Sequence, residues 1–188
     1  IFFFFSISAQ IETISTKDTT RYSEKQAMEE EKFIAATAFR LANKTKEAIP
    51  LLQELIKNNK TEPTFYYELA RTYYLDKQYD DALTNASKSV SLDPANLYYA
   101  IFEAEILEKQ GNAEMAASKY ETIISKHPRV EEYWLKMAKL YNAAAMPVKS
   151  IETFERMGNT FGFSEEILFR KFRAQSEAGD LNAAVLTL

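Results

Sequence analysis

The stretch QYDDALTNASKSVSLDP at residues 78–94 returns in pattern 34 residues later, as NAEMAASKYETIISKHP at residues 112–128. The alignment places Pro94 on Pro128 and Ala82 on Ala116. Continuing in both directions gives one column of small residues without any insertion: Ala48, Ala82, Ala116, Ser150 and Ala184. A period of this length indicates a repeat architecture, in which each unit is one supersecondary element.

Three further columns share the 34-residue period and are mostly apolar, often aromatic. They lie 16 and nine residues before each small residue and four residues after it. Their members are Lys32, Tyr66, Ala100, Trp134 and Leu168; Phe39, Tyr73, Leu107, Tyr141 and Gln175; and Leu52, Ala86, Tyr120 and Phe154. Within residues 66–73 the apolar positions recur at offsets 0, 3, 4 and 7, which is one face of an α-helix. Two antiparallel helices per repeat, A and B, cannot bury such faces alone, so neighbouring repeats are expected to stack into a solenoid.

Glycine and proline mark the ends of the expected helices. Gly111 and Gly179 fall in the turn between helices A and B. Two B helices are expected to end at Asp93-Pro94 and at His127-Pro128, because a residue that precedes proline is driven out of the helical region. Pro147 occupies the expected first turn of the fourth B helix, where a missing N–H is tolerated.

The pattern resembles the tetratricopeptide repeat, W-x2-L-G-x2-Y, then A-x3-F, then P, over 34 residues. The matching residues are Trp134, Met137, Ala138, Tyr141, Ser150 and Phe154, and in another unit Tyr66, Leu69, Ala70, Tyr73, Ala82 and Pro94. The resemblance implies an all-α fold, a tetratricopeptide solenoid of antiparallel helix pairs in a right-handed superhelix. The chain departs from the pattern at Lys32 and Ala100, at Lys60 and Gly162, and at Lys171 and Phe172.

The expected organisation follows from this period. Residues 1–9 are interpreted as the remnant of a signal peptide, residues 10–23 as a polar linker and residues 24–188 as the repeat domain. The repeats span about 29–62, 63–96, 97–130, 131–164 and, incomplete, 165–188. A fragment truncated at both ends of an exported bacterial protein is expected.

The first ten residues, IFFFFSISAQ, form the most apolar stretch of the chain. An apolar run that ends in small residues is typical of a secretory signal peptide, here with cleavage close to Ala9-Gln10. A buried strand or helix edge and a clipped membrane anchor are the alternatives. The signal-peptide interpretation predicts a periplasmic or cell-envelope location, with a cytoplasmic one less favoured.

Composition excludes several functional classes. The formal net charge of −4 and pI near 5.3 provide no basic field for a nucleic-acid partner. The chain has no cysteine, four scattered glycines and a single histidine, His127, expected in a turn. Catalytic and metal sites need several convergent groups, so no catalytic residue, no metal site and no cofactor is predicted, and the protein is not expected to be an enzyme or to take a small-molecule substrate.

The resemblance places a partner-binding groove along the A helices, one step around from their packing faces. Aromatic residues and arginine at these positions are the types that dominate interface energetics. We call the following set the A-helix stripe: Phe33, Arg40, Tyr67, Arg71, Tyr74, Tyr98, Ile101, Glu105, Leu135, Lys136, Lys139, Phe169, Arg170 and Arg173. The alternative is that some of them pack against helix A of the next repeat. The lysine and asparagines by which some family members bind a chaperone's C-terminal carboxylate are absent, whereas Lys136, Lys139, Arg170 and Arg173 could seat an acidic segment.

Two functions are compatible with these residues. The first is a non-catalytic scaffold that binds a protein or peptide segment in the groove, within an envelope complex. The second is the N-terminal sensory or docking region of a larger signalling protein, whose effector domain would lie beyond residue 188.

Overall fold

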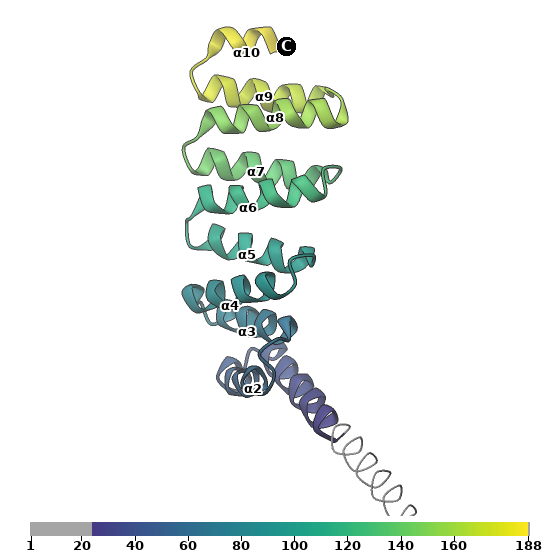
Figure 1. Cartoon of the computed structure of the whole chain (residues 1–188). Helices are drawn as coiled ribbons and strands as arrows, with labels where there is room; N and C mark the ends of the chain where they lie inside the picture. Colours follow the sequence, from purple (N-terminus) through teal and green to yellow (C-terminus); the bar gives the residue numbers. More distant parts are fainter. Residues whose placement is uncertain (1–23, 188) are drawn as a thin grey trace, which may run out of the picture.

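A computed structural model describes residues 24–187, and these fold into ten helices stacked in chain order (Figure 1). The first helix covers residues 24–41, and nine labelled helices follow. Their bounds are α2 Thr45–Asn58, α3 Pro63–Leu75, α4 Tyr79–Leu92, α5 Leu97–Lys109, α6 Ala113–Lys126, α7 Glu131–Ala143, α8 Pro147–Phe161, α9 Glu165–Glu177 and α10 Leu181–Thr187. The predicted signal-peptide remnant and linker lie outside the described residues.

The helices keep the 34-residue register of the sequence. The A helices α3, α5, α7 and α9 begin at residues 63, 97, 131 and 165, and the B helices α2, α4, α6, α8 and α10 begin at residues 45, 79, 113, 147 and 181. From α2 onwards, each helix packs chiefly against the helices before and after it in the chain. The predicted all-α solenoid of paired helices is therefore confirmed.

The column of small residues lies where helices A and B cross. Ala48, Ala82, Ala116 and Ser150 are fully buried, and Ala184 is 1% exposed. A Cβ or a hydroxymethyl group at this point lets the two backbones approach closely, and a larger side chain would overpack the contact. The column four residues later is also buried at Leu52, Ala86, Tyr120 and Phe154. The buried hydrophobic side chains form three clusters along the stack.

Aromatic residues of the column 16 residues before the small residue bond to the connection between successive repeats. Trp134 is 3% exposed, and its Nε1–H donates a hydrogen bond to the carbonyl of Pro128 at 2.9 Å. The hydroxyl of Tyr66, two repeats earlier, donates to the carbonyl of Lys60 at 3.2 Å, so the same contact recurs at the same separation. Where the pattern departs, at Lys32, the side chain instead pairs with Glu54 at 2.5 Å on the neighbouring helix.

Each A helix ends in the same turn, which brings helix B back along it. The residue after the last turn has positive φ in all five repeats: Asn43, Lys77, Gly111, Ala145 and Gly179. At Gly111 the N–H donates to the carbonyl of Glu108, and the next N–H, of Asn112, donates to Leu107. These are the two hydrogen bonds of a Schellman motif, which requires a left-handed residue. Glycine adopts that conformation without strain, whereas lysine and alanine do so at a cost.

Exchanging glycine and alanine at this turn is expected to move stability in opposite directions. Gly111→Ala should lower the free energy of unfolding by about 1 kcal/mol, and Ala145→Gly should raise it by about 0.5 to 1 kcal/mol, because φ is positive at both sites. No atom lies within 4 Å of a Cβ built at Gly111, so backbone strain alone is tested. Urea denaturation followed by helical circular dichroism measures both, and equal midpoints for the two variants would contradict the assignment.

Candidate functional site

The A-helix stripe is carried by the first helix of every repeat, but its members differ in exposure. Tyr98, Lys139, Phe169, Arg170 and Arg173 are exposed to solvent. A second group is half-buried: Phe33, Tyr67, Arg71, Tyr74, Ile101, Glu105, Leu135 and Lys136. Arg40 is buried, with 9% of its surface exposed. The exposed members lie from α5 to α9, so this part of the stripe offers a partner the most side-chain surface.

The aromatic members near the N-terminal end pack onto helix A of the next repeat. The rings of Phe33 and Phe65 lie 5.4 Å apart, centroid to centroid. Tyr67 lies 5.5 Å and Tyr74 5.4 Å from the ring of Phe102 on α5, both in edge-on geometry. Tyr67 also lies 4.8 Å from the Tyr99 ring. These contacts are those expected if stripe residues pack against helix A of the next repeat. A partner would reach only the part of each ring that remains exposed.

Arg40 belongs to an ion-pair cluster between the first two repeats. Its Nε donates to Glu68 Oε2 at 2.6 Å, and Arg71 Nη1 donates to Glu68 Oε1 at 2.9 Å. The side chains of Arg40 and Glu68 are 10% and 9% exposed. Arg71 is more exposed and lies over the Tyr67 ring at 5.5 Å, a cation–π distance. Arg40 therefore links the repeats and presents little surface to a partner.

Two tyrosines of the A-helix stripe, Tyr67 and Tyr74, have pKa values raised above that of a free tyrosine. Burial raises the pKa of Tyr67, and the carboxylates of Glu68 and Glu105 raise it further while Arg71 opposes them. Burial, with Tyr79, Glu105 and Glu108, raises the pKa of Tyr74 as well.

A hollow of about 210 Å³ lies between the last two A helices, and we call it the C-terminal hollow. It is lined by Leu135, Lys139, Asn142, Phe154, Arg170, Arg173, Ala174 and Glu177. The A-helix stripe supplies four of these residues, and α8 supplies the Phe154 ring from helix B. The structure thus brings together three of the four basic residues that the sequence suggested as a seat for an acidic segment.

A second hollow lies between the first helix and α3, and we call it the N-terminal hollow. Its volume is about 540 Å³, and it is lined by Gln26, Glu29, Glu30, Phe33, Asn59, Glu62, Thr64 and Phe65. Three of these residues are acidic and none is basic. The two ends of the A-helix surface therefore differ in charge.

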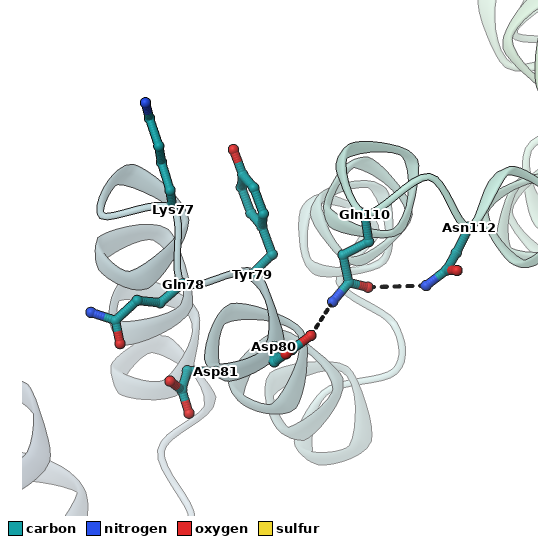
Figure 2. A pocket seen from close by; sticks show the side chains of 7 residues that line it. All are labelled: Lys77, Gln78, Tyr79, Asp80, Asp81, Gln110 and Asn112. Atoms are coloured by element: carbon teal, nitrogen blue, oxygen red, sulfur yellow. Dashed lines mark hydrogen bonds between the residues drawn. The ribbon is translucent and has the colours of Figure 1, made fainter.

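A third hollow, of about 540 Å³, lies outside the A-helix stripe, at the turns of two successive repeats. Figure 2 shows Lys77 and Tyr79 extending side by side from the turn, with Gln110 placed between Asp80 and Asn112. Gln110 donates to Asp80 at 2.7 Å and accepts from Asn112 at 3.3 Å. These polar side chains are paired with one another across the repeat boundary, so their contacts describe a link between the repeats.

The single histidine and the acidic side chains of the described residues form no candidate metal site. His127 is exposed and caps the end of α6, as the sequence predicts for a turn residue. Between residues 24 and 187, no group of three histidine, aspartate or glutamate side chains is placed to hold a metal ion. No helix in that range is both long and apolar enough to cross a bilayer.

Sequence reasoning missed three features of this surface. Glu68, the acceptor shared by Arg40 and Arg71, has no signal beyond its place three residues before Arg71 on one helix face. Phe154 appears in the sequence as a core column, and its edge in the C-terminal hollow becomes visible only when α8 is placed. Asn142 and Glu177, at the ends of α7 and α9, become neighbours only through the stacking of repeats.

No family model and no curated protein matches the chain. Solved structures do match it. The structure described as MamA 41-end from Desulfovibrio magneticus RS-1 superposes with a TM-score of 0.64 at 15% identity, over 85% of this chain and 90% of that one. Another, described as a crystal structure of MamA protein, gives a TM-score of 0.67 at 16% identity, over 85% and 87%.

The third structure is that of Naa15/Naa10 bound to HypK-THB. Its TM-score is 0.69 at 16% identity, and the match covers 81% of this chain but only 24% of that one. Similarity at such low identity shows the fold. The described residues form an all-helical solenoid of sequentially paired helices, and these matches support a tetratricopeptide-repeat architecture.

Proposed function

We propose that this chain is a non-catalytic scaffold that binds an extended or helical segment of a partner protein along its A-helix stripe. The observation that carries the proposal is the exposure of Tyr98, which is 74% exposed at a stripe position on α5, between the A helices α3 and α7. Large aromatic side chains exposed beside cations are typical of an interface, because they bury much area while keeping polar contacts. The solenoid fold supports this role, because stacked repeats present one extended surface.

The test is capture of partners by the tagged chain from an envelope extract. The variant Tyr98→Ala/Phe169→Ala should lose the captured proteins, while its helical signal and unfolding midpoint stay those of the parent chain. Met115→Ala/Val148→Ala is the matched control, because it removes two exposed apolar side chains, 52% and 65% exposed, from the B helices α6 and α8. Equal capture by the stripe variant and the control would refute binding along the A helices.

We further propose that the protein is exported to the periplasm or cell envelope. The support is the apolar run of residues 1–9 with small residues at its end, which is typical of a cleaved signal peptide. Fractionation of cells that express the tagged protein should find it in the envelope fraction, with an N-terminus close to Gln10. Retention in the cytosol with residues 1–9 intact would exclude export.

A further inference from the structure

We infer that the C-terminal hollow binds an acidic segment of a partner protein, in which a carboxylate lies among Lys139, Arg170 and Arg173 and a neighbouring apolar side chain rests on Leu135. The inference depends on the proposed scaffold function and specifies the chemistry of the partner. The proposed contacts lie at one end of the A-helix stripe.

The cations of the hollow come from two different repeats. Lys139 projects from α7, whereas Arg170 and Arg173 project from α9, one helical turn apart. Because residues three apart lie on one face of a helix, the two arginines point to the same side. The lining contains three cationic side chains and one acidic side chain, Glu177, within a chain of net charge −4. The lining is therefore richer in cations than in acids, although each of the three cations also has a glutamate partner.

The present partners of these cations are exchangeable. Arg170 pairs with Glu166 at 2.7 Å and Arg173 with Glu177 at 3.1 Å, both across one turn of the same helix. Lys139, 74% exposed, reaches Glu108 only at 3.4 Å. Exposed ion pairs of this kind contribute about 0.2 to 1 kcal/mol, so an incoming carboxylate can replace them at little cost. Arginine is suited to this role because its planar fork binds carboxylates bidentately.

The lining also has an apolar part, made of Leu135, Phe154 and Ala174, which selects more than charge. Half-buried Leu135 offers most of this apolar surface, because Phe154 is 7% and Ala174 3% exposed. A partner side chain of leucine or phenylalanine type next to the acid would cover this surface and exclude water. Partial exclusion of water strengthens the ion pairs, because the interaction energy of two charges rises as the effective dielectric constant falls.

The opposite end of the stripe disfavours the same ligand. The N-terminal hollow carries Glu29, Glu30 and Glu62 and has no cation in its lining. An acidic segment is repelled there, so charge favours the C-terminal hollow as its place of binding.

Selection from a library of random displayed peptides on the full chain tests the inference. The peptides retained should be enriched in aspartate or glutamate next to leucine or phenylalanine. Fluorescence anisotropy with one such peptide should then show affinity reduced at least about tenfold in Arg170→Gln/Arg173→Gln, because two charge-assisted contacts are lost. Affinity should also fall with added sodium chloride, since exposed charges are screened.

The matched control is Lys57→Gln/Lys88→Gln, which removes the same charge from exposed positions of the B helices α2 and α4 and should leave affinity unchanged. Peptides without acidic enrichment, or equal affinity of the arginine variant and the control, would overturn the inference. If neutral peptides are selected and the Tyr98→Ala/Phe169→Ala variant no longer binds them, the scaffold function stands and the acidic specificity fails. If no peptide is retained at all, both fail.

Discussion

Glu68→Leu is expected to lower the free energy of unfolding by about 3 kcal/mol, because it leaves the buried guanidinium of Arg40 without a counter-charge. Glu68 accepts from Arg40 at 2.6 Å and from Arg71 at 2.9 Å, and it is the carboxylate that pairs with both. Arg71 can turn toward water, since 38% of its side chain is already exposed. Arg40 is held between helices and has less freedom to do so. Urea denaturation followed by helical circular dichroism measures the loss.

A second variant separates charge burial from packing. In Arg40→Met/Glu68→Leu both charges are replaced by apolar side chains of similar length, so most of the lost stability should return. Arg40→Met alone should cost less than Glu68→Leu, because Glu68 keeps Arg71 as a partner. A double variant as unstable as Glu68→Leu would show that the loss comes from packing and that the ion pair contributes little.

The sequence predicts the fold closely because every repeat has the same local geometry and therefore the same pattern of residues. A small residue at 48, 82, 116, 150 and 184 can be recognised without structure, and the positions are buried throughout. The start of each helix follows from the same period. Gly111 and Gly179 mark the left-handed residue of the turn, whereas Lys77 and Ala145 adopt it without any sequence signal. The left-handed conformation is recognised by comparing the five equivalent turns, because a lysine or alanine in a single turn does not indicate it.

The candidate site is harder to predict, because it depends on which side chains of neighbouring repeats meet. A period places Tyr67 and Tyr74 on the face next to the packing columns, but it says nothing of the partner ring at Phe102, which comes from the next repeat. Arg40 has the spacing of a groove residue and is nevertheless buried by Glu68. Lys139 on α7 remains exposed although the A helix α9 of the next repeat follows it. Exposure is therefore set by pairs of repeats, while the sequence pattern describes each repeat alone.

Tyr67→Ala is expected to lower the free energy of unfolding by about 2 kcal/mol, because its half-buried ring contacts Tyr99 and Phe102 on α5. Tyr67→Phe keeps the ring and should lose less than about 0.5 kcal/mol, as expected when packing dominates. Tyr98→Ala is the matched control at a stripe position, since its side chain is 74% exposed and its loss should leave the urea midpoint unchanged.

Hydrogen exchange measures which helices are destabilised by Tyr67→Ala. Loss of a contact between α3 and α5 should speed exchange in these two helices more than in α8 or α9, because each repeat of a solenoid is stabilised by its nearest neighbours. An unchanged midpoint would mean that the ring adds nothing to the stack and is free for a partner. A loss of stability together with retained partner capture would assign Tyr67 to packing and leave recognition to the exposed residues from α5 to α9.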